Sequence, residues 1–236
     1  MKKIKKNSVK AKKKINTKSK KINKKPIKKS KRKIKKIKSK LKIIKSKKSK
    51  KSENSKNENN IESSGEIQRI VIGDNNAKIT IMAFESLTCS HCANFHKNVY
   101  PKLKKDFLDT GLAKIEFRHF PLDAAAFNAS KVSLCKNDGN PDILESLYAN
   151  QKKWVKGNSI EEANKNLQQY LKDEGFDINF KKCINNKEIE DFVLNDRIDG
   201  SKNFKVDSTP TIIINNEKFE KTLNYKNLKK ALEKLI

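Results

Sequence analysis

The stretch Cys89-Ser90-His91-Cys92 is the part of the sequence from which the fold can be worked out. An apolar run of β-strand type, residues 79–84, precedes it, and an amphipathic run follows it to about Gly111. A strand, a C-x-x-C motif and a helix in this order are typical of a redox-active cysteine pair. The sequence therefore predicts that Cys89 and Cys92 alternate between a dithiol and a disulfide.

The position of the pair predicts the direction of the reaction. Cys89 would lie at the helix N-terminus, where free N–H groups and the positive end of the helix dipole stabilise a thiolate. Cys92 lies one turn further along the same side, and His91 adds a hydrogen-bond donor or a positive charge. Because a stabilised thiolate makes the disulfide oxidising, we expect a donor of disulfides.

Two other roles are open to a C-x-x-C motif. It can be half of a zinc site, but Cys135 and Cys183 form no second such motif, and His91 and His96 are too local to complete a tetrahedral site easily. It can also be a structural disulfide, although a bridge closing so short a loop removes little entropy from the unfolded chain. We expect neither a metal ion nor a cofactor.

The charge of the chain is concentrated at its N-terminal end. Residues 1–51 hold 28 of the 56 basic residues and none of the 27 acidic ones, so the remainder is almost neutral. Such a segment cannot form a core, and residues 1–65 are predicted to be a disordered Lys-rich tail and linker. Residues 1–51 could make weak electrostatic contact with an anionic membrane or with nucleic acid, although no interleaved aromatic residues support base stacking.

The remaining pattern alternates strands and helices. Strands are expected at residues 67–72, 79–84, 115–120, 211–214 and 217–219, with a parallel β-α-β unit joining the second and third. Helices are expected at 89–111 with a kink at Pro101, at 124–136, over 143–154, at 159–172 and 187–204, and after Asn224 with Leu228, Ala231, Leu232 and Leu235 on one face. Residues 139–205 are therefore a nearly all-helical block within an α/β chain.

A second motif lies before the strand at 211–214. Thr209-Pro210 leads directly into this strand, and a proline there is unusual in an ordinary central strand. A cis peptide bond would leave the Thr209 backbone free to pair with a substrate held as a mixed disulfide. An ordinary strand start with a trans proline is the alternative.

Together these pieces resemble the DsbA-like thiol:disulfide oxidoreductases of the thioredoxin superfamily, of the alphaproteobacterial type. The matching segments are residues 86–93, 95–96, 101, 109–111, 118–123, 151–154, 209–211 and 214–215. The resemblance implies a thioredoxin fold with an inserted all-helical domain, an attacking Cys89, a resolving Cys92 and a cis Pro210. It divides the chain into the tail and linker (1–65), a first thioredoxin part with the C-x-x-C motif (66–138), the helical domain (139–205) and a second part with the cis proline (206–236).

Three features depart from this family. The central dipeptide is Ser-His where many relatives have Pro-His, and the Lys-rich tail has no counterpart. Ala83 occupies the position, six residues before Cys89, where relatives often have a buried acid for proton transfer. Glu85 lies nearby, and we expect it to be in another register.

The other polar and sulfur-bearing residues have simpler interpretations. His119 is expected to face outward from its strand, His96 to be a surface histidine with a possible influence on the site, and Trp154 to pack within the helical block. Cys135 and Cys183 are either two buried free thiols or, as the resemblance implies, a second and structural disulfide.

The function predicted is that of an enzyme which passes the Cys89–Cys92 disulfide to reduced, unfolded proteins. An isomerase or reductase of the same fold, or a nucleic-acid- or membrane-surface-binding protein acting through its tail, is the alternative. The resemblance implies a monomer in the periplasm, re-oxidised by a DsbB-like membrane oxidase. No apolar run has the form of a signal peptide or a membrane span, so a cytoplasmic location is the alternative.

Overall fold

A five-stranded mixed sheet is the centre of the fold. The computed structural model describes residues 66–236, and the predictions for residues 1–65 lie outside this range. The strands are β1 (Val71–Gly73), β2 (Ile79–Glu85), β3 (Ala113–His119), β4 (Thr211–Ile214) and β5 (Glu217–Lys218), in the order β1-β3-β2-β4-β5. As predicted, β2 and β3 are parallel, with Ile81 opposite Ile115, whereas the other pairs are antiparallel.

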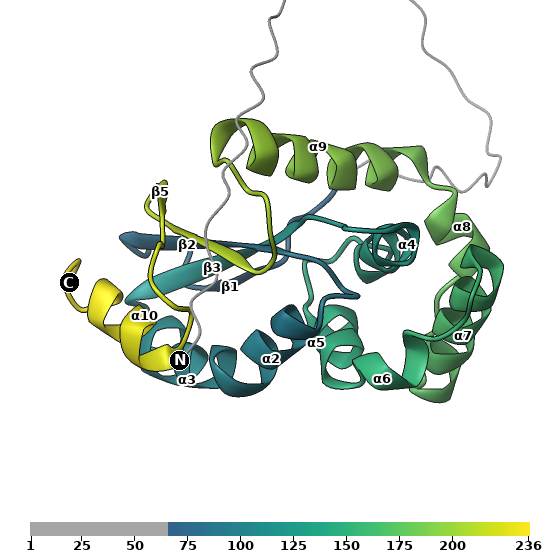
Figure 1. Cartoon of the computed structure of the whole chain (residues 1–236), viewed down its shortest axis with the longest axis horizontal. Coiled ribbons are helices and arrows are strands. Elements are labelled where there is room, and N and C mark those ends of the chain that lie inside the picture. Colours follow the sequence, from purple (N-terminus) through teal and green to yellow (C-terminus); the bar gives the residue numbers. More distant parts are fainter. Residues whose placement is uncertain (1–65) are drawn as a thin grey trace, which may run out of the picture. The chain divides into compact units, whose positions relative to one another are not determined.

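Nine α-helices and one π-helical turn are found among residues 66–236. They are α2 (Ser90–Asn98), α3 (Tyr100–Leu103), η1 (Lys104–Leu108), α4 (Ala124–Ser133), α5 (Asp142–Ala149), α6 (Gln151–Trp154), α7 (Ile160–Asp173), α8 (Phe180–Ile184), α9 (Lys187–Asn203) and α10 (Tyr225–Leu232). Figure 1 shows α9 over one face of the sheet and α2, α3 and α10 over the other. None of these helices is long and apolar enough to cross a membrane.

The alternation of side chains along β2 produces the two faces. Ile81 and Ala83 pack into the large core with α2, whereas Met82 and Phe84 pack into a smaller cluster under α9. Gly200 lets α9 approach the sheet closely, because a Cβ atom there would lie 2.7 Å from the Phe84 ring. The sheet is thus covered on both faces, as its apolar central strand predicts.

The helical segment between β3 and β4 does not have a core of its own. Leu147, Trp154 and Leu167 belong to the same continuous cluster as Ile81 and Phe95. Trp154 is buried as expected, and its indole nitrogen donates to the Leu147 carbonyl oxygen. The domain boundaries at 138/139 and 205/206 therefore stay a prediction.

Several predicted elements have different bounds in the structure. The helix expected at 89–111 is interrupted at Val99, next to Pro101, and continues as a short α-helix and a π-helical turn. The helix expected over 143–154 is split at Asn150. The last helix ends at Leu232, so Leu235 lies beyond it and is 46% exposed rather than on its buried face.

Candidate functional site

Cys89 and Cys92 lie where β2 leads into α2. Cys89 is the N-cap residue of α2 and is half-buried, whereas Cys92 lies within its first turn and is fully buried. Both are free thiols in this structure. One sulfur is thus open to a reaction partner and the other is shielded, as an attacking and a resolving cysteine require.

The two thiols have opposite acidities. A hydrogen bond from the Cys92 thiol lowers the pKa of Cys89 from 9.0 to about 5, helped by the Thr209 side chain and by the backbone N–H groups of Cys92 and His91, while burial opposes the shift. Burial raises the pKa of Cys92 well above its usual range, and the hydrogen bond to Cys89 and the charge of Glu85 add to this. Cys89 is therefore the thiolate of the reduced pair, and it is a good leaving group from a mixed disulfide with a substrate.

Thr209 faces Cys89 across the site. The Thr209–Pro210 peptide bond is cis, and the Cys89 thiol donates to the Thr209 carbonyl oxygen over 3.3 Å. The Thr209 Oγ1 atom is buried and has no hydrogen-bond partner among the described residues, so its hydroxyl is free to donate to a Cys89 thiolate. The two motifs singled out in the sequence therefore meet at one place.

His91 contributes to the low pKa of Cys89 through its backbone. Its side chain is exposed, and its backbone N–H is the group that helps to lower the pKa of Cys89. The role predicted for the His91 imidazole remains a prediction.

Two side chains from other elements hold the loop before Cys89. The amide nitrogen of Gln151, the first residue of α6, donates to the carbonyl oxygens of Leu87 (2.8 Å) and Cys89 (3.0 Å). The Thr88 hydroxyl donates to Asp123, whose other carboxylate oxygen caps α4. These contacts fix the backbone that carries the attacking sulfur, and nothing in the local sequence pattern indicated them.

A buried acid and a buried histidine lie beside Cys92, and the structure corrects two predictions here. His96 is buried rather than on the surface, and its Nε2 atom lies 2.8 Å from Glu85 Oε2. Glu85 is also buried, on the same strand face as Ala83, because the two are two residues apart on β2. Its Oε1 atom has no hydrogen-bond partner among residues 66–236. A carboxyl group is therefore present on this face of β2, two residues after Ala83.

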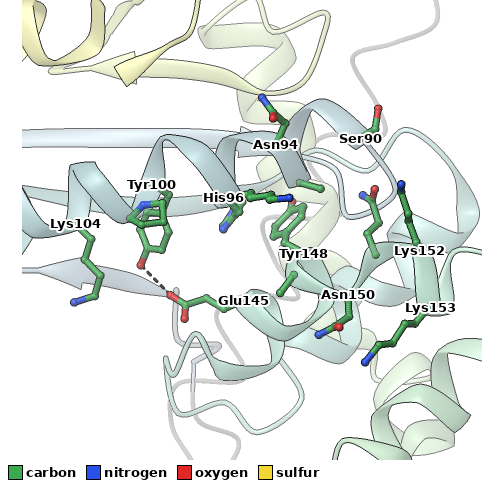
Figure 2. A pocket seen from close by; sticks show the side chains of 15 residues that line it. Ser90, Asn94, His96, Tyr100, Lys104, Glu145, Tyr148, Asn150, Lys152 and Lys153 are labelled. Carbon is green, nitrogen blue, oxygen red and sulfur yellow. Dashed lines mark hydrogen bonds between the residues drawn. The ribbon is translucent and has the colours of Figure 1, made fainter. Parts of the chain in front are cut away.

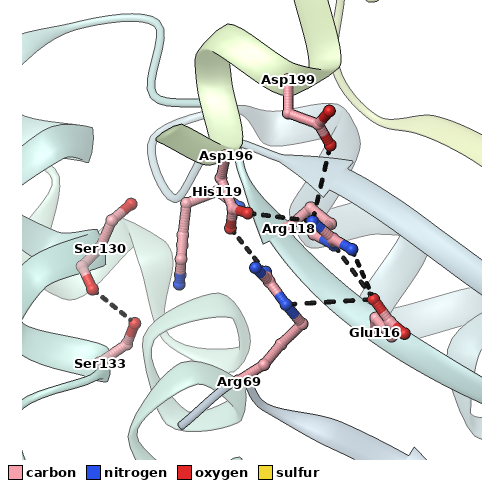
Figure 3. Close-up of polar contacts among 8 residues, drawn as sticks. All are labelled: Arg69, Glu116, Arg118, His119, Ser130, Ser133, Asp196 and Asp199. Atoms are coloured by element: carbon pink, nitrogen blue, oxygen red, sulfur yellow. Dashed lines mark hydrogen bonds and ion pairs between the residues drawn. The ribbon is translucent and has the colours of Figure 1, made fainter. Parts of the chain in front are cut away.

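The outward orientation predicted for His119 is wrong. The side chain is 3% exposed, and burial lowers its pKa to about 4 although nearby Asp196 opposes the shift. Its backbone N–H donates to Asp196, a buried carboxylate that also binds Arg69 and Arg118 (Figure 3). This network ties α9 to β3, and burial keeps His119 neutral in the interior.

A pocket lies directly beside the redox pair. It has a volume of about 880 Å³, with α2 and α3 forming one wall and α5 and α6 the other. Figure 2 shows His96 and Tyr148 inside it, with Lys104, Lys152 and Lys153 around them. Its lining includes Ser90, the residue after Cys89. No pattern in the sequence predicted this pocket.

The other two cysteines form a disulfide. Cys135, just after α4, is bonded to Cys183 of α8, and their Cα atoms are 5.4 Å apart. These sulfurs are thus not available to Cys89 and Cys92. Within the described part of the chain, no three potential ligands among His, Cys, Asp and Glu gather as a metal site would require.

Comparison with known proteins points to disulfide chemistry. The family model described as Thioredoxin matches residues 66–234. A putative protein-disulfide oxidoreductase of Rickettsia bellii is 26% identical over 172 residues, which are 71% of this chain and 64% of that protein. Disulfide bond formation protein D of Bacillus subtilis is 26% identical over 174 residues, or 70% of this chain and 75% of that protein. The chain thus spans a little under two thirds of the Rickettsia relative.

A solved structure with a similar fold also comes from a protein named for disulfide chemistry. The crystal structure of Wolbachia pipientis alpha-DsbA1 is 28% identical in sequence, covers 71% of this chain and 90% of its own, and superposes with a TM-score of 0.63.

Proposed function

The chain belongs to the thioredoxin family, and from this premise we propose that it is a DsbA-like dithiol:disulfide oxidoreductase that donates the Cys89–Cys92 disulfide to folding proteins. One observation carries the proposal: the pKa of half-buried Cys89 is lowered to about 5 beside a buried Cys92 whose pKa is raised. A thiolate so stabilised favours the reduced form of the protein, and hence transfer of the disulfide to a substrate.

The order of attack in the donation step follows from the unequal exposure and acidity of the two cysteines. A substrate thiolate attacks Cys89 Sγ in the disulfide, a substrate–Cys89 bond forms, and Cys92 leaves as a thiolate that takes up a proton. A second substrate thiolate then attacks the substrate sulfur of this mixed disulfide, and Cys89 leaves as a stable thiolate. The substrate gains one disulfide, and the enzyme is left as a dithiol. During this exchange the Thr209 backbone, at 3.3 Å from Cys89, is placed to bind the substrate chain.

Re-oxidation requires Cys92 to lose its proton inside the protein. Cys89 attacks the disulfide of an oxidant, and Cys92 must then attack Cys89 Sγ so that the oxidant leaves as a thiolate. We propose Glu85 as the acceptor of the Cys92 proton, since its charge acts on that thiol and its Oε1 atom lacks a partner among residues 66–236. His96, bonded to Glu85 and lining the pocket, would pass the proton towards solvent.

The proposal is tested with the full-length protein in its oxidised form and a reduced peptide that carries two cysteines. Cys89→Ala should abolish oxidation. In Cys92→Ala, the Cys89 thiolate should attack oxidised glutathione, release one glutathione thiolate and accumulate as a Cys89–glutathione mixed disulfide that mass spectrometry detects. The reduction potential should be less negative than about −200 mV in a glutathione titration. A potential near the roughly −270 mV of thioredoxin would contradict an oxidase.

The setting of the enzyme is proposed from the family resemblance. Work in the periplasm with a DsbB-like membrane oxidase fits the chemistry above, and fractionation of cells making the native gene product tests the location. For residues 1–51 we propose weak electrostatic contact with an anionic membrane or nucleic acid, based on their 28 basic and no acidic residues. Equal binding by the full chain and by residues 62–236 in a retardation or vesicle assay would argue against this contact.

A further inference from the structure

The pocket beside Cys89 has an aromatic floor. The rings of His96 and Tyr148 stack with their centroids 4.0 Å apart, and Tyr100 lies 5.3 Å from His96. Ala93, Pro101 and Ala149 complete the apolar part of the lining. Little of each ring is open to the pocket, since His96, Tyr100 and Tyr148 are 8%, 5% and 3% exposed, and this small apolar patch suits an apolar side chain rather than a fully hydrated one.

The rim of the pocket is positively charged. Four lysines line it, namely Lys97, Lys104, Lys152 and Lys153. Among residues 66–236, Glu145 is the only acidic residue in the lining, and it accepts a hydrogen bond from the Tyr100 hydroxyl. Lys104 and Lys153 are paired with Asp109 and Glu174, whereas exposed Lys97 and Lys152 have no acidic partner within the described residues. The pocket therefore presents unpaired positive charge around an apolar floor.

The position of the pocket connects it to the reaction. Its lining includes Ser90, next to the attacking cysteine, and Gln151, whose amide is bonded to the Cys89 carbonyl oxygen. A polypeptide joined to Cys89 as a mixed disulfide would pass this opening within a few residues. Residues 1–51 of this chain are a poor occupant, since they hold 28 basic and no acidic residues.

We propose that this pocket binds an acidic segment, bearing one aromatic side chain, of the polypeptide that exchanges its cysteine with Cys89. The acidic residues meet Lys97 and Lys152, and the aromatic ring lies on the floor made by Tyr148 and His96. This recognition deepens the proposed function and rests on it for the exchange step, whereas binding alone can be measured without that step.

Binding is tested on the full-length chain with three labelled, cysteine-free peptides of equal length, by fluorescence anisotropy. One peptide has acidic residues and one aromatic residue, the second has alanine for the aromatic residue, and the third has glutamine for the acidic residues. The first should bind roughly three- to tenfold more tightly than either of the others, as expected for a few exposed charge pairs and one buried ring. Equal affinities for all three peptides would overturn the proposal.

A matched pair of double variants locates the site. Lys97→Glu with Lys152→Glu should remove the advantage of the acidic peptide, whereas Lys165→Glu with Lys226→Glu should keep it. Lys165 and Lys226 are exposed and lie outside the pocket, and the two double variants change the net charge equally. If both double variants lose the preference to the same degree, the overall charge is responsible and the pocket proposal is wrong.

Peptides carrying a reduced cysteine pair beside the same segments separate this proposal from the proposed function. Preferential oxidation of the acidic, aromatic peptide that disappears in the Lys97→Glu/Lys152→Glu variant supports both. Equal oxidation of all peptides supports the activity and overturns the pocket as a substrate site. A binding preference with no oxidation of any peptide keeps the pocket as an acidic-peptide site and contradicts the proposed function.

Discussion

Glu85 Oε2 and His96 Nε2 lie 2.8 Å apart, and the two side chains are 3% and 6% exposed. One is the last residue of β2 and the other lies in the last turn of α2, so the pair bridges the strand that precedes the redox cysteines and the helix that carries them. The charge of Glu85 also helps to raise the pKa of Cys92. The Glu85 carboxylate should therefore influence the step in which Cys92 loses its proton.

Replacing Glu85 with glutamine distinguishes two roles for this carboxylate. If Glu85 accepts the proton of Cys92, Glu85→Gln should slow the resolution of a Cys89–glutathione mixed disulfide by roughly a hundredfold, because general-base catalysis is worth at least that much. If the carboxylate acts only through its charge, the same change lowers the pKa of Cys92 and the step becomes faster. Stopped-flow measurement of resolution gives the answer, with the exposed Glu188→Gln as the control.

The acidity of Cys89 predicts how the reduced protein responds to pH. Thiolate absorbance near 240 nm should titrate with a midpoint near pH 5 in the reduced protein, and Cys89→Ala should abolish this transition. Because the folded pKa of about 5 lies below the ordinary 9.0, the unfolded chain binds the extra proton between these values. The Cys89 contribution is thus fully present above pH 9.0 and is lost as the pH falls to about 5.

The lowered pKa of Cys89 also predicts how the thermal midpoint of the reduced protein depends on pH. The thermal midpoint of the reduced protein, measured relative to the oxidised protein, should rise as the pH increases from 5 to 8. A difference between the two forms that does not change with pH would contradict a stabilised Cys89 thiolate.

Gln151 should stabilise the loop that carries Cys89. Gln151→Glu places a carboxylate against the carbonyl oxygens of Leu87 and Cys89, so two hydrogen bonds are lost and like charges oppose each other. We expect the free energy of unfolding to fall by about 1–3 kcal/mol in urea titrations, because the Leu87 carbonyl oxygen loses its side-chain donor whereas the Cys89 carbonyl oxygen keeps the Ala93 N–H. Gln168→Glu on the exposed side of α7 should change it by less than about 0.5 kcal/mol. Equal effects of the two changes would show that the Gln151 contacts add no stability.

Local patterns in the sequence were enough to predict the centre of the fold. The apolar run of β2, the C-x-x-C motif at a helix start and the alternation of β3 each predict one element, and a β-α-β connection then requires β2 and β3 to be parallel. Periodicity places both His119 and His96 on buried faces, against the exposed positions expected for histidines. His119 continues the buried face of Ile115 and Phe117, and His96 follows Cys92 by one helical turn.

Other parts of the site could not be predicted from local sequence patterns. Gln151 reaches the carbonyl oxygens of Leu87 and Cys89 across 64 and 62 residues of sequence, and the pocket forms only where α5 and α6 pack beside α2. Periodicity within one segment says which face is buried but not which distant segment covers it. The kink in α2 and α3 was expected from Pro101, whereas the π-helical turn that follows depends on tertiary packing.

The neutral state of His119 predicts a specific pH dependence of stability. Its folded pKa is about 4, below the ordinary 6.5, so between these values the unfolded chain takes up a proton that the folded protein excludes. Stability should therefore fall as the pH drops from 6.5 to 4, by about 3 kcal/mol in total from this residue. Glutamine does not titrate in this range. In urea titrations, the loss of unfolding free energy between pH 7 and pH 4.5 should therefore be smaller in His119→Gln than in the natural protein, by about 2 kcal/mol or more. Gln168→Asn, a change at an exposed position that involves no titratable group, should leave the decline as it is. Parallel curves for the natural protein and His119→Gln would mean that His119 becomes charged inside the folded protein.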